Sequence, residues 1–218
     1  MNKTRFVFLT LALLTMLPAV ASAQMELGFR GGLNLSSFGG SDVDADFGFT
    51  GTRTALNIGA FVNVPVSDIF SVQIGGAYSK KGGQETEAGV DVTFALDYVE
   101  FPILAKISPS TAGSVGFDLF LGPTVGFKSS CKVTGDEGGV SVSFDCDDPL
   151  LDISVKSIDL GATAGVGLNI AVNDQASALI QTFYTLGLGS LDDAATDPDD
   201  IKNRGFAILV GLSYTLGG

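Results

Sequence analysis

Histidine and tryptophan are absent from this 218-residue chain, and charged side chains make up only 17% of it. Without histidine, the chain has neither a Ser-His-Asp triad nor a histidine-ligated zinc site. The net charge of −12 argues against nucleic-acid binding, because that function needs a basic surface that neutralises phosphates. The hydrophobic content of 45% argues against an intrinsically disordered chain.

A long apolar run is also missing after residue 23, so no transmembrane helix is expected there. The first residues, in contrast, carry Lys3 and Arg5, then an apolar run, then Ala21-Ser22-Ala23. We predict a secretory signal peptide over residues 1–23, cleaved before Gln24. A membrane anchor is the weaker alternative, because the apolar run is short for a bilayer.

Glycine and phenylalanine are abundant instead, and the sequence alternates with a period of two residues. In the last segment, Phe206, Ile208 and Val210 fall on one face, whereas Ala207 and Leu209 fall on the other. Seven further segments alternate in the same way, which predicts β-strands of a length suited to crossing a membrane at a tilt. The eight predicted strands cover 25–36, 54–66, 70–79, 94–107, 117–128, 158–170, 178–186 and 205–216.

The connections between these strands alternate in length, which distinguishes the two ends of the molecule. Short turns follow the second, fourth and sixth strands, and long loops follow the others, at 37–53, 81–92, 129–154 and 189–203. Residues 24–218 are therefore predicted to form an all-β domain, an eight-stranded antiparallel up-and-down transmembrane β-barrel with short periplasmic turns and long extracellular loops. The ring must close, because an open sheet edge leaves backbone groups unsatisfied in hydrocarbon.

A soluble barrel with an apolar interior is the alternative that alternation alone leaves open. The polar face favours the membrane barrel, because its residues are mostly Gly, Ala, Ser, Asn and Thr, which suit a narrow eight-stranded interior. The opposite face carries large apolar residues on all eight strands, as lipid contact requires. One irregularity is that Phe94, Leu96 and Tyr98 differ in parity from Val99 and Phe101. We expect a bulge or a stretch beyond the membrane there.

Five short motifs resemble those of PorT-like outer membrane β-barrel proteins. They are Gly31-Gly32-Leu33-Asn34-Leu35-Ser36, Tyr98-Val99-Glu100-Phe101-Pro102-Ile103-Leu104, Gly122-Pro123-x-x-Gly126, Tyr184-x-Leu186-Gly187-Leu188 and Asn203-Arg204. The resemblance spans the chain after residue 23 and implies a barrel similar in size to the OmpA-type transmembrane domain, without implying an activity. The chain departs from the family pattern at Phe183, where a basic residue is frequent, and at its Tyr214-Thr-Leu-Gly-Gly end.

Seven charged side chains are predicted to point into the barrel, where they are the candidate functional residues. Strand direction places them at three depths, with opposite charges at each depth. They are Glu26, Lys106 and Asp118 near the periplasmic end, Arg30 and Glu100 near mid-barrel, and Lys128 and Asp159 near the outer rim. We favour a packed ionic plug, because eight strands leave space only for side chains and a buried charge needs a partner. The alternative is a narrow, gated pore in which an Arg30–Glu100 pair must rearrange.

The only two cysteines, Cys131 and Cys146, lie in the third long loop. Export to an oxidising compartment makes them candidates for a disulfide, whereas two cysteines without histidine cannot complete a zinc site. The glycine-rich segment between them predicts a hairpin centred near Gly138. We expect the disulfide to staple this loop, with about 3 kcal/mol of stabilisation against the unfolded chain. A rigid hairpin presented to a partner is the alternative.

Acidic residues gather in the first and fourth long loops. They include Asp42, Asp44, Asp46, Asp192, Asp193, Asp197, Asp199 and Asp200. Carboxylate clusters can hold calcium, but this spacing does not match an EF-hand. We favour a solvated acidic surface, so neither a metal site nor a cofactor is predicted.

These features favour a small outer-membrane β-barrel protein with a structural or interaction role, a filled lumen and acidic extracellular loops. A narrow porin-type channel for small solutes is the alternative. An enzyme is not expected, because histidine is missing and the rim carries no polar constellation beyond acids. The expected partners are outer-membrane lipid, the barrel-assembly machinery during insertion and an extracellular partner at the loops. We expect a monomer in the bacterial outer membrane that binds no nucleic acid.

Overall fold

The computed structural model describes residues 24–41, 43, 49, 51–87, 89–109, 113–146, 148, 153–193 and 200–217. The predicted signal peptide lies outside these residues. Within them, no helix is long and apolar enough to cross a membrane. The strands are β1 (Glu26–Gly39), β2 (Gly51–Pro65), β3 (Phe70–Glu87), β4 (Val90–Ile107), β5 (Val115–Glu137), β6 (Val140–Asp145), β7 (Ile158–Ala171), β8 (Ala176–Gly187) and β9 (Lys202–Thr215).

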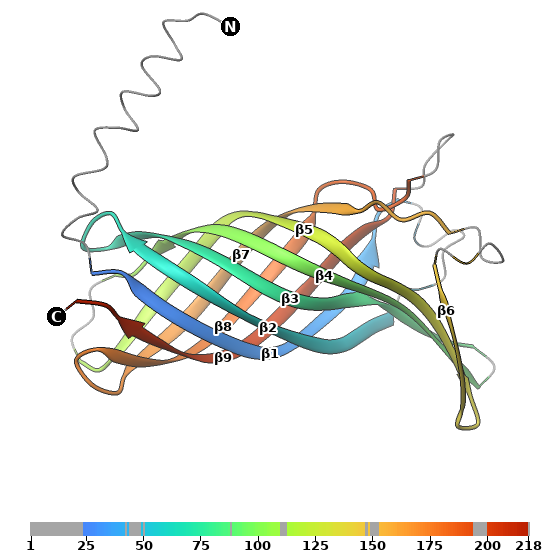
Figure 1. Cartoon of the computed structure of the whole chain (residues 1–218), viewed down its shortest axis with the longest axis horizontal. Coiled ribbons are helices and arrows are strands. Elements are labelled where there is room, and N and C mark those ends of the chain that lie inside the picture. Colours follow the sequence, from blue (N-terminus) through green and yellow to red (C-terminus); the bar gives the residue numbers. More distant parts are fainter. Residues whose placement is uncertain are drawn as a thin grey trace, which may run out of the picture.

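Eight of these strands form a closed antiparallel ring, which confirms the predicted barrel (Figure 1). The ring runs β4-β3-β2-β1-β9-β8-β7-β5, and pairing between β4 and β5 closes it. The remaining strand, β6, stands outside the ring and pairs with the far end of β5. The start of β1 and the end of β9 lie together at the end of the barrel that carries the short turns.

A broad apolar surface covers the outside of the ring. Phe29, Leu121 and Leu212 are 72%, 65% and 64% exposed, and large apolar side chains are exposed on all eight ring strands. Leaving such a surface in water costs about 25 cal/mol for each Å² of apolar area. Hydrocarbon removes this cost, so the outer face suits a lipid environment.

The strands extend further toward the long loops than the sequence pattern indicates. β3 runs to Glu87 and β4 begins at Val90, so most of the loop predicted over 81–92 is a continued hairpin. β5 likewise continues to Glu137. The apolar alternation fades there because strand ends beyond the hydrocarbon no longer need an apolar outer face.

The start of β4 alternates without interruption, so the change of parity expected there is not a bulge in this strand. The register shift beside Asp97 and Tyr98 places its extra residue on β5. Phe94, Leu96 and Tyr98 are each at most 2% exposed and belong to an apolar cluster at the mouth on the long-loop side, beyond the apolar band. Their parity therefore differs from that of the lipid-facing residues because they face the inside of the molecule.

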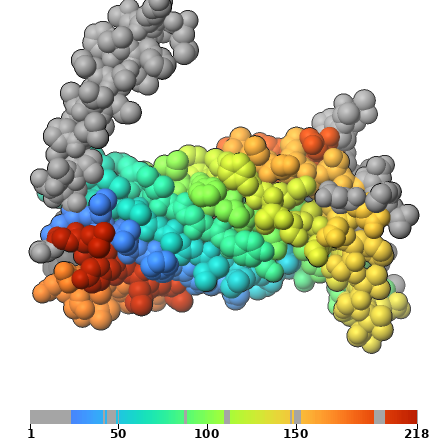
Figure 2. Space-filling model, in the orientation of Figure 1, coloured from blue at the N-terminus to red at the C-terminus, as the bar shows by residue number. Residues whose placement is uncertain are grey.

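The hairpin of β5 and β6 projects beyond the barrel as the yellow segment in Figures 1 and 2. Gly138 and Gly139 form its turn with φ of 59° and 88°, values that glycine adopts without strain. The predicted disulfide joins Cys131 and Cys146 at the base of the hairpin, with Cα atoms 5.4 Å apart. The hairpin is therefore covalently closed where it leaves the barrel.

Candidate functional site

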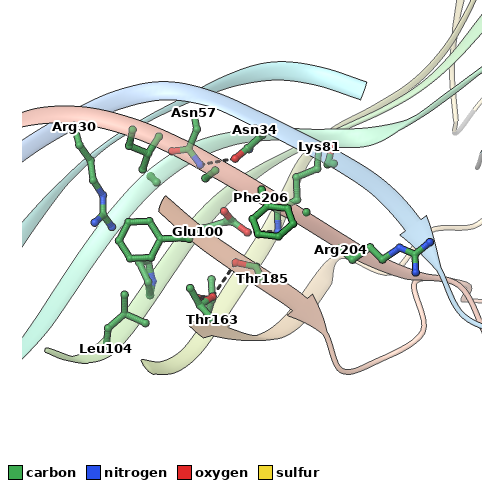
Figure 3. A pocket seen from close by; sticks show the side chains of 18 residues that line it. Arg30, Asn34, Asn57, Lys81, Glu100, Leu104, Thr163, Thr185, Arg204 and Phe206 are labelled. Carbon is green, nitrogen blue, oxygen red and sulfur yellow. Dashed lines mark hydrogen bonds and ion pairs between the residues drawn. The ribbon is translucent and has the colours of Figure 1, made fainter. Parts of the chain in front are cut away.

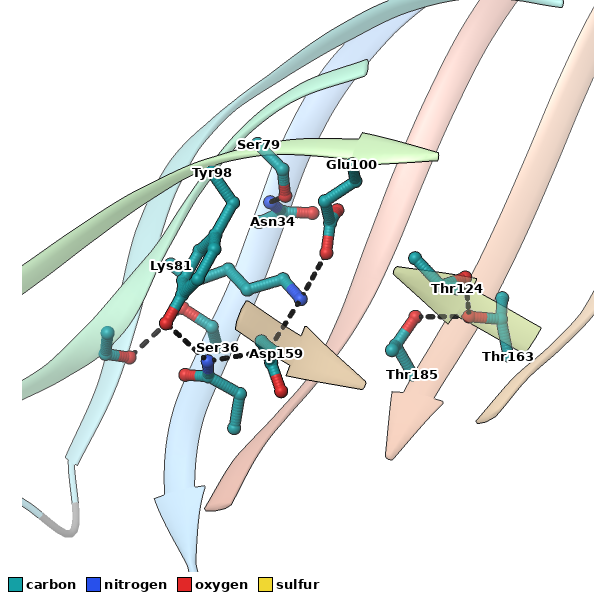
Figure 4. A network of polar contacts seen from close by, with 12 residues as sticks. Asn34, Ser36, Ser79, Lys81, Tyr98, Glu100, Thr124, Asp159, Thr163 and Thr185 are labelled. Carbon is teal, nitrogen blue, oxygen red and sulfur yellow. Dashed lines mark hydrogen bonds and ion pairs between the residues drawn. The ribbon is translucent and has the colours of Figure 1, made fainter. Parts of the chain in front are cut away.

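A buried group of opposite charges lies beneath the extracellular mouth, and we call it the upper cluster (Figure 4). Lys81 forms an ion pair with Glu100, and Lys81 Nζ lies 3.8 Å from Asp159 Oδ2. Asn203 Nδ2 donates hydrogen bonds to Asp159 Oδ2 at 2.9 Å and to the Tyr98 hydroxyl oxygen at 3.3 Å. All five residues are buried. The cluster thus ties β3, β4, β7 and β9 together across the lumen.

A second charged group lies near the short turns, and we call it the lower cluster. Lys106 Nζ lies 3.5 Å from Glu26 Oε2 and 3.4 Å from Asp118 Oδ2. Asn63 Nδ2 donates to Glu26 Oε2 at 2.6 Å, and Asn169 Nδ2 donates to Asp118 Oδ2 at 3.0 Å. The three charged residues are those that strand direction placed at this depth. Here too the side chains cross the lumen from different strands.

Arg30 lies on β1 between the two clusters. Its Nη1 donates to Gln73 Oε1 at 3.0 Å and to Gln181 Oε1 at 2.9 Å. Its guanidinium carbon also lies 5.1 Å from the ring centroid of Phe61 and 4.6 Å from that of Phe183, within cation–π range. Neutral amides and aromatic faces therefore hold this buried charge.

The interior charges alternate along the barrel axis. Each cluster combines one ammonium group with two carboxylates, and Arg30 stands between them as a separate positive charge. A permeating cation would be repelled by Arg30, and an anion would be repelled by the carboxylates on either side. This order of charges opposes the passage of ions of both signs.

Two of the predicted charge pairs are not formed. Arg30 contacts amides and aromatic rings in place of Glu100. Lys128 Nζ donates to the Val155 carbonyl oxygen at 2.6 Å, whereas Asp159 belongs to the upper cluster. Strand direction gives the depth of a residue but not its place around the ring, and that place decides which partner lies within reach.

Lys81 is a charged residue of the upper cluster that is not among the predicted interior charges. The sequence pattern places it in a long loop, whereas β3 extends past it and its side chain is buried. A signal was present, because Gln73, Ser79 and Lys81 share one parity and all three are buried. The inward polar face of this strand continues beyond the membrane boundary, so extending its parity from Gln73 and Ser79 predicts that Lys81 points inward.

A small cavity lies between Arg30 and the upper cluster (Figure 3). Its volume is about 60 Å³, and Asn34, Asn57, Lys81 and Glu100 are among its lining residues. A water molecule needs about 10–15 Å³ of such space, so the cavity has room for a few waters and not for a larger solute.

Aromatic rings fill the lumen by lying against glycines. A Cβ atom added to Gly28 would collide with the ring of Phe61, and one added to Gly165 would collide with the ring of Phe183. Phe183 also packs on Phe120, with ring centroids 5.1 Å apart. The small residues of the inner face therefore make room for large ones on neighbouring strands.

An apolar layer closes the lumen above the upper cluster, and we call it the mouth cluster. Its buried members are Phe38, Val43, Phe94, Leu96, Tyr98, Cys131, Cys146, Leu191 and Ile201. Several strands contribute to it, together with residues of the connections between strands. The disulfide is thus part of the layer that covers the charged interior.

The acidic loop residues are described only in part. Within the described ranges, no group of three or more His, Cys, Asp or Glu side chains could hold a metal ion. Asp200 Oδ1 pairs with Lys202 Nζ at 2.7 Å. Of the acidic residues named for the first and fourth loops, five lie outside the described ranges: Asp42, Asp44, Asp46, Asp197 and Asp199.

The ring of strands has an apolar outer face and a lumen filled by side chains. A comparison of the sequence with known families agrees with this architecture. The profile of the outer membrane protein beta-barrel domain matches residues 20–193. The chain belongs to this family. It is accordingly a barrel of the bacterial outer membrane, with its short turns in the periplasm and its long loops outside.

Among solved structures, OprG from Pseudomonas aeruginosa shares the fold. It is 13% identical, with a TM-score of 0.52 over 90% of this chain and 98% of its own. Neisserial surface protein A is 11% identical with a TM-score of 0.48, covering 88% of this chain and 96% of its own. Ail of Yersinia pestis is 14% identical with a TM-score of 0.41, covering 88% and 99%. No curated protein matches the sequence.

Proposed function

We propose that this outer-membrane barrel is sealed, and that it has a structural or interaction role exercised through its extracellular loops. The observation that carries the proposal is the mouth cluster, which covers the upper cluster with buried apolar side chains. From the extracellular side, water and ions would have to cross this layer before they reached the polar groups of the lumen. In a sealed barrel, the parts that remain available to a partner are the loops and the projecting hairpin.

The arrangement of the interior supports the same proposal. Opening a path would separate the Lys81–Glu100 pair, and isolated buried charges are costly. It would also move Phe61 and Phe183, which enclose Arg30 and lie against glycines. The cavity beside Arg30 favours a narrow porin, but its volume of about 60 Å³ suits only water.

The finer assignments are part of the proposal. The five motifs described above support a place for the chain among PorT-like barrels. We expect a monomer without enzymatic activity that contacts outer-membrane lipid, the barrel-assembly machinery during insertion and an extracellular partner at its loops. The projecting hairpin supports the last of these, because Val140, Val142 and Phe144 are 69%, 50% and 41% exposed on it.

Single-channel conductance in a planar bilayer tests the sealed barrel. We expect silence from the refolded wild type and leak from the double variant Tyr98→Ala, Phe183→Ala, which removes one ring from the mouth cluster and one from mid-lumen. The matched control is Phe101→Ala, Phe206→Ala, which removes two lipid-facing rings and should remain silent. Steady conductance in the wild type would establish the porin instead. Silence in the lumen variant would show that these rings are not the seal.

A further inference from the structure

The two ends of the lipid-facing surface differ in charge. At the periplasmic end, the outward side chains include Met25, Ile107, Val115 and Tyr214, which are uncharged. At the extracellular end, three strands within one arc of the ring each carry a basic residue. We call these three residues the basic collar. Its members are Arg53 on β2, Lys80 on β3 and Arg204 on β9.

The collar begins where the apolar band ends. Phe206 and Tyr78 are exposed apolar residues on the outer face, and Arg204 and Lys80 follow them one outward position closer to the extracellular end. Figure 3 shows Arg204 beyond Phe206 toward the end of the strands. The basic groups therefore lie at the level where hydrocarbon gives way to headgroups.

The pairing of β1 places the arginines at one level. Arg204 is paired with Ser37, and Arg53 is paired with the preceding residue, Ser36. Arg204 Nε donates to Ser37 Oγ at 3.4 Å, which leaves the rest of its exposed guanidinium available. Adjacent strands are about 4.8 Å apart, so the collar spans about 14 Å from β9 to β3.

Arg53 has the parity of the buried Asn57 and is paired with the buried Ser36, yet part of its side chain remains exposed. The pairing of β2 with β3 shifts register between Thr52 and Asn57, and such a shift re-aims a side chain. The guanidinium donates to the Lys81 carbonyl oxygen and lies within electrostatic reach of Asp97 and Tyr78.

Asp97 offsets only part of the positive charge. Its Oδ2 accepts from the Tyr78 hydroxyl at 2.5 Å and lies 3.7 Å from Lys80 Nζ. Lys80 nevertheless keeps 38% of its side chain exposed. Three basic groups and one carboxylate leave the collar with an excess of two positive charges, in a protein whose net charge is −12.

We propose that the basic collar binds the anionic, phosphate-bearing headgroups of outer-leaflet lipid. Guanidinium and ammonium groups at the headgroup level are suited to phosphate oxygens, and guanidinium can bind them in a bidentate manner. Among the described residues, no outward basic side chain lies at the periplasmic boundary, whose turns carry Asp68 and Asp174, so the lipid preference is confined to one leaflet. The proposal concerns the outer surface and stands or falls independently of whether the lumen conducts.

The absence of tryptophan provides a direct test. A single tryptophan introduced by Phe206→Trp reports on lipid beside the collar, and one introduced by Tyr214→Trp on the same strand reports on the periplasmic end. Each protein is refolded into phosphatidylcholine vesicles that contain brominated phosphatidylglycerol or, separately, brominated phosphatidylcholine. We expect phosphatidylglycerol to be enriched about fivefold beside the collar reporter and to lose this advantage in 0.5 M KCl. The periplasmic reporter should show no such advantage.

The triple variant Arg53→Gln, Lys80→Gln, Arg204→Gln, combined with Phe206→Trp, should abolish the enrichment beside the collar. Lys132→Gln is the matched control, because it removes a basic group from the projecting hairpin, where its side chain is 53% exposed. The heat-dependent gel mobility of each variant shows that the barrel has folded. Equal quenching of the collar reporter by the two lipids, equal enrichment at both reporters, or enrichment that survives in the triple variant would each overturn the proposal.

Discussion

The upper and lower clusters contain the same kinds of charged group but have different surroundings. Each places one lysine between two carboxylates, and each adds an asparagine that donates to a carboxylate. The mouth cluster covers the upper one. The lower one, in contrast, adjoins a hollow of about 510 Å³ at the periplasmic mouth, which Glu26, Asn63 and Ser108 help to line.

This difference shows that the same set of charged groups can differ in its access to water. A carboxylate of the lower cluster that loses its partner can be hydrated from the hollow, since 20% of the Glu26 side chain is exposed. Asp159 cannot be hydrated in this way, because only 5% of its side chain is exposed and its Oδ1 already has no hydrogen-bond partner. Loss of one charged partner should therefore lower the free energy of unfolding more in the upper cluster than in the lower one.

The largest expected effect comes from removing the two lysines in turn. Lys81→Met leaves two buried carboxylates without their cation and should lower the free energy of unfolding by about 3–5 kcal/mol. Lys106→Met should cost about half as much, because water can reach Glu26. Urea unfolding of the refolded barrel in lipid vesicles, followed by gel mobility, measures both.

The charge-free version of the upper cluster serves as the control. The triple variant Lys81→Met, Glu100→Gln, Asp159→Asn should recover most of the stability lost in Lys81→Met, because no unpaired charge remains. Equal losses for Lys81→Met and Lys106→Met would contradict the distinction between the clusters.

A smaller effect is expected from the disulfide, which belongs to the mouth cluster and has no equivalent at the lower end. The double variant Cys131→Ser, Cys146→Ser removes a bond across 15 residues and should destabilise the hairpin by about 3 kcal/mol at most. Because the ring ladders remain, the barrel itself should lose less. Limited proteolysis should cut the hairpin faster in this variant while the barrel fragment stays folded. Unchanged cleavage would show that the mouth cluster holds the hairpin without the bond.

The smallest effect concerns pH at the extracellular rim. The hydrogen bond from Lys202, together with one from the backbone N–H of Ser41, lowers the pKa of the Asp200 carboxyl below its ordinary value of 3.8. A pKa that is lower in the folded state contributes stability above pH 3.8 and loses it as the pH falls through the folded value. Asp200→Asn should therefore be slightly less stable than the wild type at pH 6 and equal to it in strong acid. Unfolding curves between pH 6 and pH 2 measure the difference, and a constant gap across this range would refute it.

Sequence patterns were sufficient for the ring and less so for its contents. The period of two placed all eight ring strands, because lipid requires an apolar residue at every second position of a strand. The same pattern could not find the strand ends, since β3 and β5 continue where that requirement ceases. Lys81 lies in the part of β3 that the pattern does not predict, so it is absent from the predicted interior charges.

The charged interior was predicted by residue type but not by partner. The grouping of Glu26, Lys106 and Asp118 followed from depth alone, because each lies near one end of its strand. Arg30 and Glu100 share a depth yet do not pair, since Arg30 lies between Phe61 and Phe183. Their positions around the ring depend on the register of every strand.

The sequence by itself determined the fold class, the membrane-facing surface, the hairpin turn and the cysteine pair, because these follow from local alternation and composition. Only the tertiary structure decided which charges meet, how the mouth cluster seals the lumen and where the basic collar gathers. The physical reason is that a closed ring brings together residues from strands distant in sequence. Their contacts depend on strand tilt, register and bulges, which no local pattern encodes.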